Sequence, residues 1–162
     1  MKHNIKVTIG LCAKNAEATI GHAIDSIIMQ DFPHKLMELI IVDGYSKDRT
    51  LDVVRSKLKG SKIEHKIFRE KKGLGHARQV VVDNARGEFI VWVDADMILS
   101  KDFVRKQVSF MESHPKVGIA KGRYGVHERT NLIAMLEDIE FAINFRHEGE
   151  PKVRPLGTSG CI

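Results

Sequence analysis

Two aspartates, Asp94 and Asp96, are separated by one residue and directly follow the apolar run Phe89–Val93. If the backbone stays extended there, both side chains lean to the same side. Two carboxylates in that arrangement suit a hard divalent cation, which takes oxygen ligands and usually shares them with substrate phosphates. Short Asp-x-Asp sequences also arise by chance, and in turns with a capping acid. The position directly after an apolar strand favours the metal-binding interpretation.

A glycine-rich stretch, Gly73-Leu74-Gly75, opens a predicted helix and could let the backbone approach a phosphate at the helix N-terminus. The rival interpretation is a dinucleotide-binding fingerprint, which needs Gly-x-Gly-x-x-Gly and an acid about 20 residues later. Gly73, Gly75 and Asp94 meet most of that pattern, but Arg78 stands where the third glycine is required. A long charged side chain there would obstruct helix–strand packing and would serve better as a phosphate ligand.

Candidate binding residues also follow the first two apolar runs. Asp43 ends the run Leu39–Val42, and its carboxylate could accept a hydrogen bond from a nucleobase N–H. The alternative is an acid that closes the turn or stabilises the next helix. Asn15 could likewise bond a base or cap the first helix. Cys12 and Ala13 stand at the end of the first run, where they could line the same site, although Cys12 is also explained as a small buried hydrophobe.

The elements that must position these residues alternate along the chain. The apolar spacing switches repeatedly between strand and helix patterns, which indicates alternating strands and helices. The predicted strands are too apolar to have a solvent-exposed face. Together these features argue for an α/β fold with a mainly parallel sheet and helices on both faces. Ligands bind such sheets at the carboxyl ends of the strands, so the candidate residues should share one rim. Strands are predicted over Ile5–Cys12, Glu38–Asp43, Ile63–Phe68, Phe89–Val93 and Val117–Ala120, and helices over Glu17–Gln30, Leu51–Leu58, Gly75–Gly87, Asp102–His114 and Leu132–Phe145.

Composition narrows the class of protein. The 162 residues are about one domain, and 43% hydrophobic with 29% charged residues excludes a disordered tail. The longest apolar run is about five residues, against the ~20 needed to span a bilayer. Two cysteines do not make a disulfide scaffold and suggest a reducing compartment, hence a cytoplasmic location. The net charge is +5, but the aromatic residues do not interleave with the basic ones, so no nucleic-acid partner is expected.

The last stretch of the chain changes character. Residues 147–151 are polar and turn-prone, and residues 156–162 are small and loop-like, without a closing element. We therefore expect residues 1–162 to form a single domain that is incomplete at its C-terminus.

Taken together, the motifs resemble those of the family 2 glycosyltransferases, which have the GT-A fold. The resemblance covers roughly residues 5–162, and four motifs occur in the family's order. They are the opening around Asn15, the second-strand motif 38–50, the glycine-rich motif 73–79 and the segment 85–96 with its Asp-x-Asp. The chain departs from the family pattern at Gly44, where a second acid is frequent, at Tyr45, where glycine is frequent, and at Gln79, where asparagine is usual.

The resemblance implies transfer of a sugar from a nucleotide-diphospho-sugar, a UDP- or GDP-sugar, to an acceptor hydroxyl with inversion. It places Asp43 at the base, Arg78 at the base or the phosphates, and Asp94 at the ribose or the metal. Asp96 would bind Mn²⁺ or Mg²⁺. Residues 157–160 resemble the segment that precedes the family's general base, so that base is expected beyond Ile162 and this chain would turn over poorly.

Two alternatives from other functional classes stay open at this point. A sugar-phosphate nucleotidyltransferase also uses a parallel sheet, a phosphate loop and an acid-bound Mg²⁺, and Arg78 with Asp-x-Asp suits either enzyme. A non-catalytic nucleotide-binding fragment is the third hypothesis. The sequence does not identify the acceptor, which could be a glycan, a lipid or a protein. It permits association with the cytoplasmic face of a membrane only through a part beyond Ile162.

Overall fold

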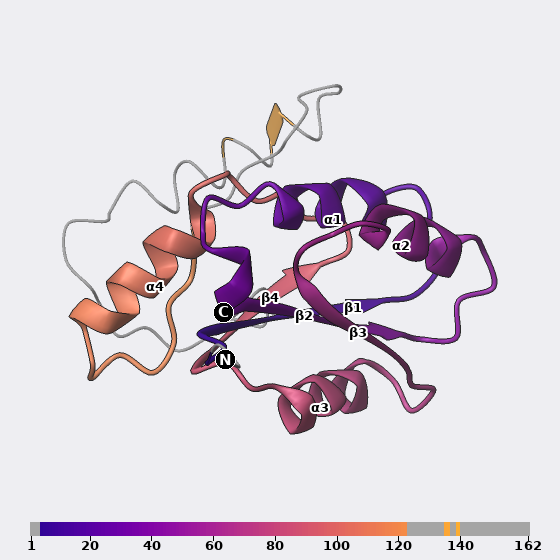
Figure 1. Ribbon diagram of the computed structural model, residues 1–162. Coiled ribbons are helices and arrows are strands. Elements are labelled where there is room, and N and C mark those ends of the chain that lie inside the picture. Colours follow the sequence, from indigo (N-terminus) through magenta and orange to yellow (C-terminus); the bar gives the residue numbers. More distant parts are fainter. Residues whose placement is uncertain (1–3, 123–134, 137–138, 140–162) are drawn as a thin grey trace.

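The computed structural model describes residues 4–122, 135–136 and 139, and Figure 1 shows their arrangement. Within these residues, strands and helices alternate as the apolar spacing predicts. A short 3₁₀ turn, His34–Leu36, precedes the second strand. The elements in chain order are β1 (Val7–Ala13), α1 (Ile20–Ile28), β2 (Met37–Asp43), α2 (Thr50–Leu58), β3 (Glu64–Arg69), α3 (Leu74–Asn84), β4 (Phe89–Asp94) and α4 (Phe103–Ser113).

The four strands form one sheet in the order β3-β2-β1-β4, and every neighbouring pair is parallel. Every residue of β2 is buried, and so is β1 except for the half-buried Cys12, because helices cover both faces of the sheet. The predicted α/β class with a parallel sheet is therefore confirmed. Among the described residues, no helix combines the length and the apolar character needed to cross a membrane.

Each face of the sheet carries its own apolar cluster. One cluster joins Ile9, Leu11 and their neighbours to helices α1, α2 and α4. The other contains Ile40 and Val42 and is covered by Ala77 and Val81 of α3. Figure 1 shows α3 on one side of the sheet and α1 with α2 on the other. Successive side chains of a strand point to opposite faces. A side chain at a strand end therefore meets either α3 or the helices of the other face, depending on its position in this alternation.

Helix α3 approaches the sheet closely at Gly10 in the centre of β1. A Cβ atom at this position would lie 2.7 Å from Cγ1 of Val81 and 2.8 Å from the ring of Trp92. Such distances are shorter than real Cβ atoms show, so only glycine fits here without a shift. The missing side chain lets α3 and Trp92 meet across β1, which brings α3 close to the end of β4.

At the opposite, amino end of the sheet, a buried carboxylate links the strands. Glu38 of β2 is 1% exposed and accepts hydrogen bonds from Thr8 Oγ1 of β1 at 2.7 Å, and from N and Nε of Arg86 at 2.7 and 2.8 Å. Arg86, just before β4, also pairs with Glu64 of β3 at 2.7 Å. Burial alone would raise the pKa of Glu38, but the bonds from Thr8 and Arg86 outweigh it and hold that pKa below its ordinary value.

Two predicted elements are not found among the described residues. The predicted strand over residues 117–120 is wrong, because this stretch forms no strand in the structure. Val117 instead donates its N–H to the carbonyl of His114 at 2.8 Å, in the turn that follows α4. Four residues that include Gly118 have too little apolar surface to secure a place in the sheet. The predicted helix over residues 132–145 falls almost wholly outside the described residues.

We expect Arg86→Ala to destabilise the protein by about 2–3 kcal/mol, because the substitution leaves the buried Glu38 carboxylate without its charged partner. The value is set below that of a fully buried pair since the Arg86 side chain is 43% exposed. Urea unfolding followed by circular dichroism measures the loss. The matched control is Arg55→Ala, which removes an exposed pair with Asp52 and should cost less than about 0.5 kcal/mol. Equal losses in the two variants would contradict this account.

The same network predicts how stability depends on pH. The folded pKa of Glu38 lies below the ordinary value of 4.5, so the folded state binds this proton more weakly than the unfolded chain. The stabilisation from Glu38 is complete above the ordinary pKa of 4.5, and it is lost as the pH falls through the lower pKa of the folded state. We expect Glu38→Gln to be less stable than the parent at neutral pH, and the gap to narrow in acid. A gap that stays constant on acidification would show that the charge of Glu38 is unimportant.

Candidate active site

A cavity of about 260 Å³ opens at the carboxyl ends of β1 and β2, beside the start of α3. Its apolar wall comes from the two strand ends and the first turns of α3. Three residues singled out from the sequence, Cys12, Ala13 and Gly73, are among those that line it. Gly73 has a φ of 104°, a conformation that L side chains rarely adopt, so glycine permits the turn into α3. The lining residues are Cys12, Ala13, Lys14, Val42, Gly44, Glu70, Lys71, Gly73, Leu74 and Ala77.

Next to this cavity, Arg78 of α3 lies between two residues of β4. Its Nη2 is 3.9 Å from Oδ1 of Asp94, and its guanidinium carbon is 5.7 Å from the centre of the Trp92 ring. Asp94 is the register partner of Cys12. The structure thus brings together three residues that are widely separated in the sequence. The Arg78 and Asp94 side chains are 44% and 54% exposed, so both charged groups remain accessible to a ligand.

The thiol of Cys12 is shielded in this arrangement. Burial raises its pKa to about 11, the positive charge of Arg78 lowers it, and the negative charge of Asp94 raises it. A thiol with such a pKa carries almost no thiolate near neutral pH and is a poor nucleophile. Cys12 is therefore suited to form part of the cavity wall and unsuited to react.

Asp94 and Asp96 do not continue one extended segment. β4 ends at Asp94, and Ala95 and Asp96 form a turn in which Met97 donates its N–H to the carbonyl of Asp94 at 3.0 Å. The expectation that an extended backbone aligns the two carboxylates is therefore wrong. In the described part of the chain, no group of three or more His, Cys, Asp or Glu side chains could hold a metal ion. A cation at this turn would need further oxygen ligands from elsewhere.

Asp43 lies on the other face of the sheet and is 1% exposed. Its carboxylate accepts the N–H of Ser46 at 3.2 Å and the Nε–H of Arg69 at 3.1 Å. Arg69, its register partner on β3, stacks over the ring of Tyr45 at 4.3 Å. This geometry matches the turn-closing interpretation of Asp43. Tyr45 adopts a positive φ of 58°, at the position where the sequence departs from the glycine frequent in the family.

Asn15 joins two loops at the same end of the sheet. Its backbone N–H donates to Ser46 Oγ at 2.9 Å, and its side-chain Oδ1 accepts the N–H of Lys47 at 2.8 Å. Two residues later, Glu17 makes a similar exchange with the next residues of that loop, Asp48 and Arg49. Asn15 therefore ties the loop after β1 to the loop after β2, and the side chain does not cap α1, for which no capping bond is present.

Of the predicted site residues, Gly75 and Asp96 remain to be placed. Gly75 is the second residue of α3 and faces open space, since a Cβ added there would meet nothing within 4 Å. Asp96 is exposed in the turn after β4. Both positions are accessible from the carboxyl edge of the sheet.

Glu70 is a cavity residue that the sequence reasoning did not select. It follows the last residue of β3, and its side chain is 12% exposed. The carboxylate accepts the backbone N–H of Lys72 and pairs with Nδ1 of His76 at 2.7 Å. The N–H of Lys72, followed by the charge of His76, outweighs partial burial and lowers the pKa of Glu70. The available signal was an acid at a predicted strand end, directly before the glycine-rich stretch.

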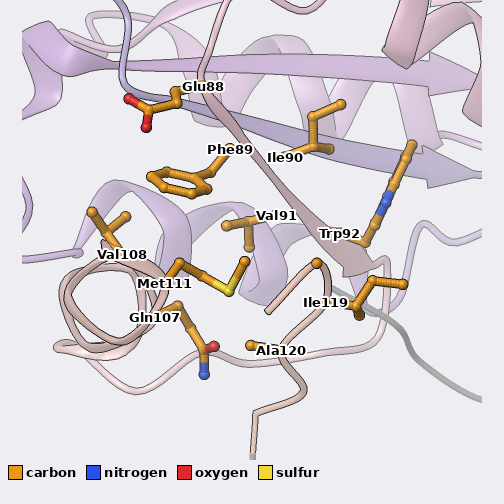
Figure 2. Close-up of a pocket in the computed structure, with 11 residues that line it drawn as sticks. Glu88, Phe89, Ile90, Val91, Trp92, Gln107, Val108, Met111, Ile119 and Ala120 are labelled. Carbon is orange, nitrogen blue, oxygen red and sulfur yellow. The ribbon is translucent and has the colours of Figure 1, made fainter. Parts of the chain in front are cut away.

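A second cavity, of about 300 Å³, lies along the edge strand β4 from its amino end to Trp92. Figure 2 shows its walls, with Phe89 and Val91 of β4 facing Val108 and Met111 of α4, and Ile119 nearby. The stretch 118–120 lines this cavity without joining the sheet. Because its lining contains none of the site residues predicted from the sequence, it does not belong to the candidate site.

Comparison with known proteins identifies the family. The sequence profile described as "Glycosyl transferase family 2" matches residues 8–162. The chain belongs to glycosyl transferase family 2. This membership confirms the resemblance seen in the motifs, and it favours a glycosyltransferase over the nucleotidyltransferase alternative.

Two relatives of the chain are described as glycosyltransferases with different roles. Poly(ribitol-phosphate) beta-N-acetylglucosaminyltransferase TarS of Staphylococcus aureus is 32% identical over 115 residues, which are 68% of this chain and 19% of the relative. The putative teichuronic acid biosynthesis glycosyltransferase TuaG of Bacillus subtilis is 33% identical over 98 residues, 60% of this chain and 38% of the relative. The matched region thus spans about a fifth to two fifths of these family 2 relatives.

Solved structures of glycosyltransferases share the fold. A crystal structure of S. aureus TarS residues 1–349 in complex with UDP-GlcNAc has a TM-score of 0.69 at 27% identity, covering 78% of this chain and 37% of that one. Mannosyltransferase PcManGT from Pyrobaculum calidifontis, in complex with GDP-Man and Mn²⁺, has a TM-score of 0.68 at 26% identity, covering 75% and 37%. The expected GT-A glycosyltransferase fold is confirmed.

The raised pKa of Cys12 predicts slow alkylation. In a Cys161→Ser background Cys12 is the only cysteine, because the chain contains two. A pKa of about 11 against an ordinary 9.0 lowers the thiolate fraction at pH 8 about 100-fold. We expect iodoacetamide to modify the native protein at least that much more slowly than the urea-unfolded one, as followed by mass spectrometry. Similar rates in the two states would contradict the burial of this thiol.

Proposed function

We propose that the protein transfers a sugar from a nucleotide-diphospho-sugar, a UDP- or GDP-sugar, to an acceptor hydroxyl. The observation that carries the proposal is the Arg78–Asp94 pair, exposed beside a cavity at the carboxyl ends of parallel strands. Ligands bind sheets of this type at that edge. Membership of glycosyl transferase family 2 supports the reaction, and solved relatives in complex with UDP-GlcNAc and GDP-Man support the sugar-donor class.

In this proposal the cavity receives the nucleoside and Arg78 binds the diphosphate or the base. Cys12 and Ala13 offer a small apolar wall. Gly73 and Gly75 leave the start of α3 unobstructed, so that a phosphate can approach backbone N–H groups at the helix N-terminus. A guanidinium suits phosphate because its planar N–H groups match two phosphate oxygens. Asp94, beside Arg78, is placed to accept hydrogen bonds from the ribose or to bind the cation.

A divalent cation, Mn²⁺ or Mg²⁺, belongs to the proposal. The donor set fits a hard ion, because Asp94 and Asp96 supply carboxylate oxygens in an exposed turn. Two carboxylates are too few for a complete site, so the diphosphate would supply further ligands. When bound, such an ion acts as a Lewis acid that neutralises the charge developing on the departing nucleoside diphosphate. The structurally similar mannosyltransferase PcManGT, solved in complex with GDP-Man and Mn²⁺, supports this assignment.

The acceptor half of the reaction rests on residues outside the proposed sugar-donor site. An acceptor hydroxyl attacks the anomeric carbon from the face opposite the diphosphate, which inverts that carbon, and a carboxylate base removes its proton. We place that base beyond Ile162 and expect little turnover without it. Residues 1–162 would then form the nucleotide-binding part of a single GT-A domain that works in the cytoplasm or at the cytoplasmic membrane face.

Asp43 and Asn15 take supporting parts in the proposed site. Asp43 holds Arg69 and closes the turn after β2, and Asn15 joins that turn to the end of β1. Both contacts shape the rim of the cavity next to Gly44. The direct contact of Asp43 with a base that the family resemblance implies would require its buried carboxylate to become accessible.

Calorimetric titration tests the proposal. We expect UDP or GDP to bind the purified protein with Mn²⁺, and Asp96→Asn to reduce the gain in affinity that Mn²⁺ provides by about tenfold or more. The matched control is Asp52→Asn, an exposed aspartate in the first turn of α2 that should leave binding unchanged. Tighter binding of nucleoside triphosphate than of diphosphate would favour a nucleotidyltransferase. Absence of nucleotide binding would overturn the proposal.

A further inference from the structure

The short connection that carries Asp96 is held at both of its ends. At one end, Asp94 is the last residue of β4 and the register partner of Cys12, which fixes it to the sheet. At the other end, Leu99 is 7% exposed and belongs to the apolar core. Asp96 itself is exposed, so the backbone of this connection, and not the packing of its own side chain, determines where its carboxylate lies.

Gln30, just after the end of α1, fastens the chain beyond Leu99. Its side-chain Oε1 accepts the N–H of Val104 at 2.9 Å, and its Nε2 donates to the carbonyl of Ser100 at 2.9 Å and to the carbonyl of Ser26 at 3.0 Å. Val104 is the second residue of α4, where the backbone N–H has no acceptor inside the helix. One amide, in a residue that is 5% exposed, therefore joins α1 to the segment after β4 and to the start of α4.

Ser26, in the last turn of α1, adds a second buried bond. Its hydroxyl donates to the carbonyl of Ala23 at 2.7 Å and accepts the N–H of Leu99 at 3.1 Å. A buried polar group that loses its partner costs free energy, so these bonds favour a single arrangement of the chain around Leu99. The end of α1 thus determines the path of the backbone that leaves the Asp94–Asp96 turn.

We propose that Gln30 is a positioning residue for the proposed cation site, because it holds the connection that places Asp96 beside Asp94. The inference rests on the proposed function, since it assumes that the cation binds at this turn. Gln30 is too buried to touch a ligand and acts only through the backbone. Glutamine suits the task because its amide both accepts and donates hydrogen bonds, whereas a carboxylate only accepts them and a thioether does neither well. Ser26 shares this role through Leu99.

The inferred role concerns the cation and not the cavity. Leu99 and Val104 belong to the apolar cluster that α1, α2 and α4 share with the sheet. The cavity beside α3 is lined by neither of them, nor by Gln30. Loss of the Gln30 amide should therefore impair the part of nucleotide binding that depends on the cation, and leave the part that does not.

Isothermal titration of the purified protein with UDP or GDP, with and without Mn²⁺, tests this role. The ratio of the two affinities is the Mn²⁺ enhancement. Gln30→Met keeps the length of the side chain and removes its hydrogen bonds. We expect it to lower the enhancement at least about threefold and to change the affinity without Mn²⁺ less than about twofold. Groups bonded to metal ligands typically account for about tenfold or more in metal affinity, and Gln30 acts one step further away.

Thr8→Val is the matched control for the loss of buried hydrogen bonds. Thr8 is 0% exposed, and its Oγ1 donates to Glu38 at 2.7 Å and accepts the N–H of Gly87 at 2.9 Å, at the amino end of the sheet. We expect both Thr8→Val and Gln30→Met to lower the melting temperature. Only Gln30→Met should lower the Mn²⁺ enhancement, measured well below both melting temperatures. An equal loss of enhancement in Thr8→Val would overturn the inference, because any loosening of the fold would then suffice.

Two further variants keep the inference testable. Ser26→Ala removes only the bond to Leu99, so it serves if Gln30→Met folds poorly, and it should lower the enhancement in the same direction but by less. In the double variant with Asp96→Asn, Gln30→Met should cause no further loss, because a residue that acts through Asp96 has nothing to position once that carboxylate is gone.

The outcomes separate this inference from the proposed function. If Mn²⁺ does not strengthen nucleotide binding to the parent protein, the proposed cation site fails and the inference fails with it. If the parent shows the enhancement and the folded Gln30→Met and Ser26→Ala variants keep it, the proposed function stands and the role of Gln30 is overturned. Additive losses in the double variant with Asp96→Asn would also overturn that role.

Discussion

Glu38 carries a charge to the amino end of the sheet, where it is 1% exposed, and a charge at that depth is stable only with partners. Thr8 and Arg86 supply them, and Arg86 extends the network to Glu64. Residues from β1, β2, β3 and the segment before β4 therefore meet around one carboxylate. Because this stabilising network lies at the amino end, the loops at the carboxyl ends of the strands do not have to provide it and can carry binding residues.

The carboxyl edge is divided between the two faces of the sheet. On the α1 and α2 side, the side chains of Asp43 and Asn15 accept hydrogen bonds from the loop after β2, and these bonds hold the loops of the carboxyl edge in place. On the α3 side, Cys12 lines a cavity that a ligand can enter, and the exposed pair of Arg78 and Asp94 lies next to it. Gly10 makes this second side possible, because its missing side chain lets α3 lie close to β4. Polar residues at neighbouring strand ends thus have different roles, because their side chains point to different faces of the sheet.

The sequence predicts the four described strands and helices to within a few residues, because alternating and helical apolar spacing reflect burial directly. It also predicts that Arg78 and Asp94 share an edge, because parallel strands align their carboxyl ends. It does not single out Glu70, and it leaves Asp43 open between a base contact and a turn-closing role. Order along the chain does not reveal whether a strand-end carboxylate faces a cavity or a turn. That depends on Arg69 and Ser46, whose bonds to Asp43 form only after folding.

The pairing of Arg78 with Asp94 bears on the order in which a cation and a nucleotide would bind. Nη2 of the guanidinium lies 3.9 Å from Oδ1 of the carboxylate and offsets its charge. A divalent cation added alone to Asp94 would stand beside that guanidinium and be repelled by it. A diphosphate carries enough negative charge to attract both groups and to lie between them. Under the proposed function the cation and the diphosphate therefore bind together, with Arg78 turning from the carboxylate to the phosphate oxygens.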